Sequence, residues 1–149
     1  MEPAQQPGSH PPLAAHKLRR RHGDRLGGFA AATFKRGIAC INIPTTLLSM
    51  IDAAVGGKTG INFNGLKNEI GSFYPADQVM IDSQFLKTLD MPNLLSGYGE
   101  MLKHGLISQP SHWSELLTFD FAHIDYALLQ KLIGQSVQVK EDIVEKRPL

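Results

Sequence analysis

The spacing of apolar residues changes near residue 90, and this change restricts the folds that the chain can adopt. Before it, β-branched apolar runs at residues 38–43 and 79–82 predict two buried strands. After it, a spacing of three or four positions predicts helices at residues 94–107, 113–117 and 126–146. The sequence therefore predicts an α/β part over residues 26–90, followed by an all-helical part over residues 91–149.

The composition excludes several classes of function. A formal net charge of +1 creates no field that would attract the chain to nucleic acid or membrane. No apolar run approaches the roughly 20 residues of a membrane span. The single cysteine, Cys40, cannot form an intramolecular disulfide and fits a reducing compartment, and the start of the chain lacks the apolar core of an export signal. We therefore expect a cytoplasmic protein that binds neither nucleic acid nor membrane.

The first 25 residues differ in composition from the rest of the chain. They carry prolines, which interrupt helices, and a basic run that begins at Lys17. A short basic run without interleaved aromatic residues is a weak indication of nucleic-acid binding. We therefore expect residues 1–25 to form a disordered tail.

Two threonines mark the first candidate ligand site. The predicted strand at residues 38–43 ends at Pro44, and Thr45 and Thr46 follow directly. In open α/β sheets, ligands bind at the carboxyl ends of the strands. A helix is predicted over residues 47–55, and one of the threonine hydroxyls could cap it.

A glycine-rich stretch at residues 56–60 suggests a phosphate-binding loop. Glycines let a backbone approach a ligand closely, and Lys58 adds a positive charge. The motif is not a Walker loop, because Asp52 stands where that motif needs a glycine. In a second turn-rich stretch, Lys67 beside Asn68 could hold a phosphate and a hydroxyl together. From the residues alone, both stretches could equally be surface loops.

Three polar residues share one face of the helix predicted at residues 94–107. Glu100, Lys103 and His104 are three and four positions apart, which places them side by side. Glu100 and His104 could be two metal ligands at this spacing. The alternative is an ordinary surface ion pair between Glu100 and Lys103 or His104.

Four segments, taken in order, carry a resemblance to a known family. They are PTTLLS from residue 44, DAAVGGKTGIN from residue 52, GLKN from residue 65 and GYGEMLKHG from residue 97. Their order and spacing resemble the core of 3-dehydroquinate synthase. The resemblance covers about residues 26–146, and no single motif carries it.

The resemblance implies a fold and a reaction. The fold would be the C-terminal part of a Rossmann-like nucleotide-binding domain, joined to the start of a helical metal-binding domain. The reaction would convert 3-deoxy-D-arabino-heptulosonate 7-phosphate to 3-dehydroquinate and phosphate, a step of the shikimate pathway of aromatic amino acid biosynthesis. NAD would be reduced and regenerated in each cycle, and a divalent metal, zinc or cobalt, would polarise the substrate oxygens.

The resemblance also assigns roles to individual residues. Those placed at the substrate are Asp52, Lys58, Asn68, Lys103 and Lys140. Those that match NAD contacts are Thr45, Thr46, Lys58, Lys67, Phe85, Leu86, Lys87 and Thr88. Glu100 matches the carboxylate metal ligand, whereas His104 matches no ligand position. Arg36 resembles the arginine that reaches a neighbouring subunit's site, which implies a homodimer.

The sequence departs from the family near both ends. Where the family has a glycine-rich turn, GGGxxGDxxGF, residues 20–29 are RRHGDRLGGF. Nothing upstream resembles the family's first strands, so we expect the strand at residues 38–43 to expose an edge. Arg147 replaces a family aspartate, and two histidine metal ligands are missing, which should abolish tight metal binding. We therefore expect this chain to be inactive as a fragment.

Two other functions remain open on the sequence. One is a related cyclase that acts on sedoheptulose 7-phosphate by the same mechanism. The other is a non-catalytic, truncated remnant that folds poorly or binds a partner. Asn68, Lys103 and Lys140 together favour the dehydroquinate branch of the superfamily.

Overall fold

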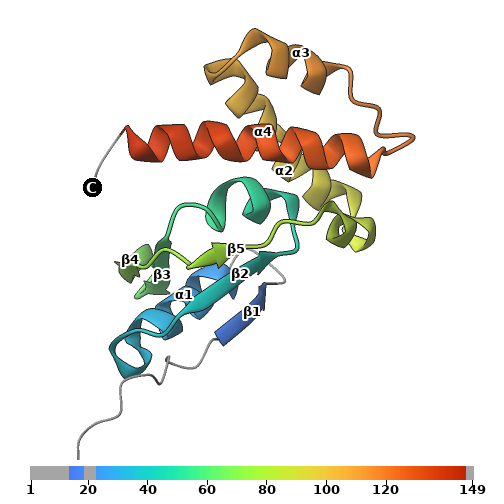
Figure 1. The fold of residues 1–149 in the computed structure, drawn as a ribbon. Helices are drawn as coiled ribbons and strands as arrows, with labels where there is room; N and C mark the ends of the chain where they lie inside the picture. Colours follow the sequence, from blue (N-terminus) through green and yellow to red (C-terminus); the bar gives the residue numbers. More distant parts are fainter. Residues whose placement is uncertain (1–13, 19–22, 147–149) are drawn as a thin grey trace, which may run out of the picture.

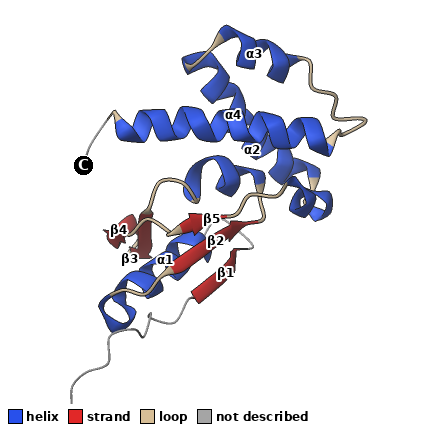
Figure 2. Ribbon diagram, in the orientation of Figure 1, coloured by secondary structure: helices blue, strands red, loops and turns tan. Residues whose placement is uncertain are grey.

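The structure is a computed structural model that describes residues 14–18 and 23–146. Its strands are β1 (Ala14–Leu18), β2 (Cys40–Pro44), β3 (Lys58–Phe63), β4 (Leu66–Phe73) and β5 (Gln78–Val79). Its α-helices are α1 (Gly23–Thr33), α2 (Met91–Ile107), α3 (Pro110–Leu117) and α4 (Tyr126–Glu145). Short helical segments of other types are η1 (Phe34–Arg36), η2 (Ser49–Ala53) and η3 (Ser83–Thr88). The strands lie before residue 80 and the long helices α2 to α4 after residue 90, as predicted (Figure 2).

A parallel sheet in the order β1-β2-β5 forms the first half (Figure 1). Ala14 pairs with Cys40 on one side of β2, and Gln78 pairs with Ile41 on the other. The expectation that this strand would expose an edge is therefore wrong. The expected tail also differs, because residues 14–18 form a strand and α1 begins at Gly23. The rest of the expected tail, residues 1–13 and 19–22, lies outside the described residues.

An antiparallel hairpin replaces the two loops expected at residues 56–60 and 62–68. Strands β3 and β4 pair from Lys58 opposite Phe73 to Phe63 opposite Leu66. The two residues between them, Asn64 and Gly65, both have positive φ, at 50° and 82°. Two-residue hairpin turns need such dihedrals, and Asn-Gly supplies them at low steric cost.

Prolines and aspartates set where the long helices begin. Pro92 and Pro110 lie in the first turns of α2 and α3, where the missing N–H costs nothing. Asp125 caps α4, because its carboxylate accepts hydrogen bonds from the backbone N–H groups of Ala127 and Leu128. The helical half thus follows from local sequence signals.

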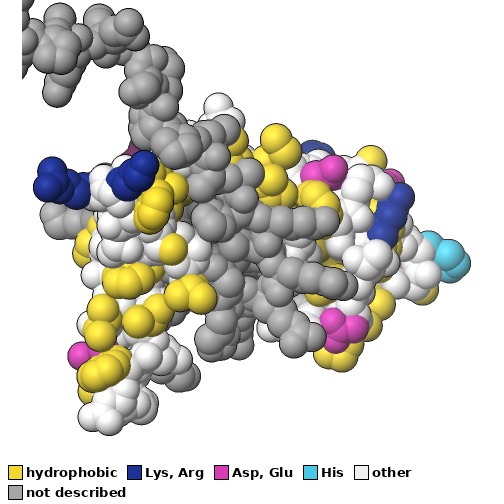
Figure 3. All heavy atoms as spheres, turned by 90° about the horizontal axis from the view of Figure 1, so that it is seen from below, with side chains coloured by type: hydrophobic (Ala, Val, Ile, Leu, Met, Phe, Trp, Pro, Cys, Tyr) yellow, Lys and Arg dark blue, Asp and Glu magenta, His cyan; other side chains and the backbone are white. Residues whose placement is uncertain are grey.

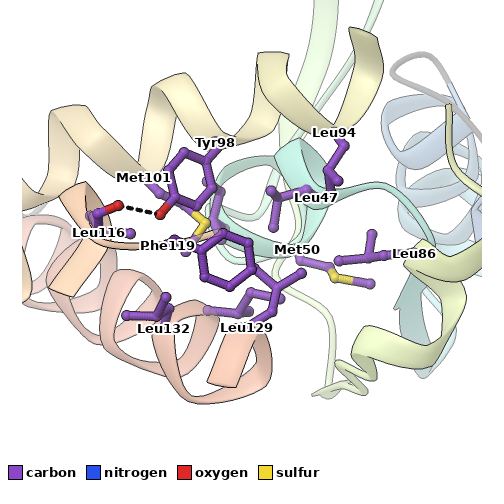
Figure 4. Close-up of a cluster of buried hydrophobic side chains, with 12 residues drawn as sticks. Leu47, Met50, Leu86, Leu94, Tyr98, Met101, Leu116, Phe119, Leu129 and Leu132 are labelled. Atoms are coloured by element: carbon purple, nitrogen blue, oxygen red, sulfur yellow. Dashed lines mark hydrogen bonds between the residues drawn. The ribbon is translucent and has the colours of Figure 1, made fainter. Parts of the chain in front are cut away.

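One apolar core joins the two halves of the chain. Leu47, Met50 and Ile51, from the turn that follows β2, are fully buried and belong to the same cluster as residues of α2, α3 and α4 (Figure 4). Within it, the Tyr98 hydroxyl donates a 2.7 Å hydrogen bond to the carbonyl of Leu116. This shared core fixes the turn after β2 against α2 and α4, and so positions the polar residues that lie nearby.

A close contact between α2 and the turn after β2 depends on a glycine of α2. A Cβ atom at Gly97 would lie 2.6 Å from the Leu47 Cβ and 2.7 Å from the Leu48 backbone nitrogen. We therefore predict that Gly97→Ala lowers the free energy of unfolding by about 1–3 kcal/mol, because the backbone must move to accept the methyl group. Urea denaturation of the purified variant measures this loss.

Gly99 provides the matched control on the same helix. A Cβ atom there meets nothing within 4 Å. Gly99→Ala should therefore raise the free energy of unfolding by about 0.5–1 kcal/mol, through helix propensity alone. Equal effects of the two substitutions would contradict the proposed packing.

Candidate active site

The structure brings together side chains from three elements that share the core. Asp52 lies on η2, Glu100, Lys103 and His104 lie on α2, and Lys140 lies on α4. Asp52 comes one residue after the buried Ile51, so the same turn that anchors the core presents its carboxylate at the junction. Residues from both halves of the described chain therefore lie near the junction of these halves.

An ion pair connects η2 and α4 at this junction. The Lys140 Nζ lies 2.7 Å from the Asp52 Oδ1, and the two side chains are 26% and 39% exposed. Both groups are thus accessible from solvent, yet each is fixed by a helical segment that packs on the common core. Two residues predicted to act on the substrate are therefore direct neighbours.

A second charged group lies on α2. The Glu100 carboxylate contacts the Lys103 ammonium through Oε1, and the His104 Nε2 lies 3.7 Å from the same oxygen. Burial lowers the pKa of His104, while the charge of Glu100 acts in the opposite direction. The charges of Lys140 and Asp52 also act on this ring. Both ion pairs thus act electrostatically on the same ring, and we call the two pairs together with His104 the polar cluster.

His104 is more buried than a member of a surface ion pair would be, although its spacing from Glu100 suggested such a pair. Its side chain is only 2% exposed, so the ring belongs to the interior of the molecule and not to a solvated helix face. The periodicity of α2 offered a signal for this, because His104 follows the fully buried Met101 by three positions. The charged residues Glu100 and Lys103, which are close to His104 in the sequence, instead suggested an exposed position.

The carboxyl end of β2 carries the expected threonines. Thr45 is buried, and the Thr46 Oγ1 lies 2.6 Å from the Ser49 Oγ, one turn into the following helix. This edge of a parallel sheet fits a nucleotide in position and in polarity.

The η3 segment, which was expected to hold NAD, contributes mainly to packing. Leu86 is buried in the core, and the Lys87 ammonium lies over the Tyr126 ring at 5.4 Å from its centroid. The Thr88 hydroxyl donates a 3.4 Å hydrogen bond to the Phe85 carbonyl. Any contact of Leu86 with a ligand would therefore involve its backbone.

The remaining predicted residues lie on η1 and on the β3–β4 hairpin. Lys58 is exposed at the start of β3, and Arg36 is exposed at the end of η1, where its φ is 67°. Among the residues that the structure describes, neither forms an ion pair with the cluster. Lys67 and Asn68 lie on β4, at the hairpin.

The donor set does not complete a metal site. Within residues 14–18 and 23–146, no group of three or more His, Cys, Asp or Glu side chains is placed to hold a metal ion. Glu100 could supply one carboxylate, but its Oε1 already contacts Lys103.

Comparisons with known proteins give the family. Residues 23–96 match the family described as 3-dehydroquinate synthase N-terminal. A 3-dehydroquinate synthase of Parabacteroides distasonis is 63% identical over 123 residues, which are 83% of this chain and 35% of the relative. One from Streptococcus equi subsp. equi is 44% identical over 121 residues, 81% of this chain and 33% of the relative.

The chain belongs to the 3-dehydroquinate synthase family. It spans about a third of the length of the curated relatives that it matches. The resemblance that the ordered motifs indicated is thus confirmed.

Solved structures support the same assignment. A 2-epi-5-epi-valiolone synthase from Streptomyces hygroscopicus subsp. jinggangensis, solved with NAD+ and Zn2+ bound, superposes with a TM-score of 0.75 and 32% identity. It covers 83% of this chain, and this chain covers 36% of it. A 2-deoxy-scyllo-inosose synthase gives a TM-score of 0.73 at 27% identity, over 81% of this chain and 35% of that one.

The Asp52–Lys140 pair should be measurable as a coupling between the two halves. We predict a coupling energy of about 0.5–1 kcal/mol between the substitutions Asp52→Asn and Lys140→Met, as is typical of partly exposed ion pairs. A double-mutant cycle by urea denaturation measures this coupling energy. It should shrink in 1 M salt, where charges are screened beyond roughly 3 Å.

The Glu115–Lys131 pair is the internal control for this cycle. It joins α3 to α4 at 2.9 Å, outside the candidate site. Asp52 and Lys140 substitutions should be additive with substitutions of this pair. Full additivity between Asp52→Asn and Lys140→Met themselves would show that the ion pair does not form in solution.

Proposed function

We propose that this chain carries the central part of a 3-dehydroquinate synthase, which converts 3-deoxy-D-arabino-heptulosonate 7-phosphate to 3-dehydroquinate and phosphate. The observation that carries the proposal is the cluster of Asp52, Glu100, Lys103 and Lys140 at the junction of the two halves. The curated relatives, at 63% and 44% identity, bear that enzyme's name.

The charges of the cluster suit this substrate. The substrate carries a phosphate and a carboxylate, so cations must converge on it. Lys103 and Lys140 supply two, and each is at present paired with a carboxylate, Glu100 or Asp52. A bound anion would compete for these ammonium groups, so we propose that substrate binding rearranges both ion pairs. Lys58 and Asn68, on the hairpin, are proposed to complete the anion site.

NAD is the proposed cofactor, and it would supply reversible hydride transfer when bound. The solved relatives include structures with NAD+ bound. The proposed holding residues are Thr45 and Thr46 at the carboxyl end of β2, Lys58 and Lys67 on the hairpin, and residues 85–88 of η3. Hydroxyls and backbone groups at such a sheet edge would fix the position of the nucleotide and exclude water from its reactive face.

The donor set of the described residues does not by itself fit a metal. The solved relatives contain Zn2+ or Co2+. Glu100 is the proposed carboxylate ligand of this chain, and the other ligands would have to come from outside residues 14–18 and 23–146. The 149-residue chain by itself is expected not to turn over.

A homodimer is the proposed assembly, with Arg36 directed toward the partner's site. The hairpin exposes large apolar side chains, each at least 41% exposed: Phe63, Leu66, Ile70 and Phe73. Hydrophobic side chains are exposed at several places on the face of the molecule drawn in Figure 3. An apolar surface of this kind suits a subunit contact.

The structure has no helix in its described part that could cross a membrane. We propose a cytoplasmic location.

A related cyclase is the second candidate function. The solved relatives named above make other cyclic products, although at 32% and 27% identity. Sedoheptulose 7-phosphate is therefore the competing substrate. It lacks the carboxylate of the heptulosonate, so an enzyme for it would need fewer cations at the site.

A chimera tests the proposed function directly. In it, the 123 matched residues of this chain replace their counterparts in the Parabacteroides distasonis relative. With NAD and zinc added, we predict that the chimera releases phosphate from the heptulosonate substrate. Lys103→Met should lower kcat/KM by about 10- to 100-fold, the effect of losing one charge-assisted hydrogen bond.

Two comparisons make the outcome decisive. Lys131→Met, which removes a lysine from the α3–α4 pair outside the site, should leave kcat/KM unchanged. Faster phosphate release from sedoheptulose 7-phosphate would favour the related cyclase. A folded chimera that acts on neither substrate would favour a non-catalytic remnant.

The dimer is tested by changing the hairpin surface. Phe63→Glu places a charge where an apolar side chain is 60% exposed, so it should shift the chain from dimer to monomer. Light scattering after gel filtration measures the molar mass. Leu106→Glu, at a 67% exposed position on α2, should leave the mass unchanged. A monomeric unsubstituted chain would contradict the proposed assembly.

A further inference from the structure

Two buried polar atoms near the end of α2 are unpaired. The His104 Nδ1 and the Ser108 Oγ are both buried and have no hydrogen-bond partner among the described residues. Such groups are rare in native proteins, because a buried donor or acceptor without a partner loses the hydrogen bond that water would otherwise provide. Two of them four positions apart at the end of one helix call for a common explanation.

These atoms continue a row that begins at Glu100. Glu100 and His104 lie one turn apart on the same face of α2, and Ser108, the C-cap residue that directly follows the helix, comes four positions after His104. The His104 Nε2 already faces the Glu100 Oε1 at 3.7 Å, slightly longer than a hydrogen bond. A hydrogen bond between these two atoms therefore requires one of the two side chains to rotate.

We propose that Ser108, His104 and Glu100 form a hydrogen-bond relay that fixes the orientation of the Glu100 carboxylate. The Ser108 hydroxyl donates to the His104 Nδ1, and the His104 Nε2–H donates to the Glu100 Oε1. His104 is then a positioning residue for the site, not a metal ligand. Its importance for the reaction rests on the proposed function, but the relay itself does not.

The donors and acceptors of Glu100, His104 and Ser108 permit one consistent set of hydrogen bonds. A carboxylate can only accept, so the ring nitrogen that faces Glu100 must carry the hydrogen. In a neutral ring the other nitrogen, Nδ1, is then an acceptor, and a serine hydroxyl is a suitable donor. Burial, which lowers the pKa of His104, agrees with a neutral ring. The relay thus satisfies both unpaired atoms at once.

The relay gives the carboxylate a defined direction. Lys103 approaches Glu100 from the exposed side of α2, and its ammonium contacts the same oxygen, Oε1, that His104 faces from the interior. With Oε1 held from two sides, Oε2 is left with a fixed orientation toward a ligand. Buried partners that orient a functional carboxylate in this way are common around active sites.

The tautomer of His104 tests the relay without any turnover. The chain has six histidines, so we would label it with 15N-histidine and assign the His104 ring signals with His104→Gln. Two-bond 1H–15N spectra of the full chain near pH 7.5 should show a fixed tautomer with hydrogen on Nε2 and none on Nδ1. Hydrogen on Nδ1, or an equal mixture of tautomers, would overturn the proposal.

Variants of Ser108 test the second hydrogen bond. Ser108→Ala removes the donor, so the Nδ1 resonance should move downfield toward that of a free acceptor nitrogen. Ser108→Thr keeps a hydroxyl and should restore the original shift. Ser114→Ala, on α3, removes a hydroxyl that bonds the Pro110 carbonyl and serves as the control. A Ser108→Ala spectrum identical to the control's would also overturn the relay, and neither result depends on whether the chimera is active.

Discussion

The apolar core shared by the turn after β2 and the helices α2 and α4 is the constraint on which the site depends. Leu47, Met50 and Ile51 are fully buried against these helices. Because Asp52 follows directly, burial of its neighbours holds its carboxylate beside Lys140. The apolar packing thus does the positioning, and the 2.7 Å ion pair adds only a modest coupling.

The same constraint explains why the charges lie at the junction of the two halves. An α/β part supplies a sheet edge that suits a nucleotide, and a helical part supplies ammonium and carboxylate groups. A substrate bound between them could contact groups from both parts. Gly97 allows α2 to approach the Leu47 backbone closely, so one small residue sets how near these groups come.

The sequence predicted the elements that depend on local signals. Helical periodicity located α2, α3 and α4, and the β-branched run located β2. The hairpin was missed because Gly57 and Gly60 suggested a flexible loop, although Asn64-Gly65 is a strong hairpin signal. Strand β1 was missed because its partner residues in β2 are distant in sequence and its own composition is weakly apolar.

The site was predicted unevenly, for a similar reason. Ordered motifs identified Asp52, Glu100, Lys103 and Lys140, and the fold brings these together. The burial of His104 was missed, because its charged neighbours Glu100 and Lys103 outweighed the periodicity of α2. A histidine beside a glutamate and a lysine resembles a solvated ion pair in sequence, whereas the structure places its ring in the interior.

The most direct test of the central claim is a crystal structure of the chimera with a non-hydrolysable phosphonate analogue of the heptulosonate. The account predicts that the analogue binds at the junction, with oxygen atoms in hydrogen-bond contact with the Nζ atoms of Lys103 and Lys140. Binding elsewhere, with both lysines still paired to Glu100 and Asp52, would contradict it.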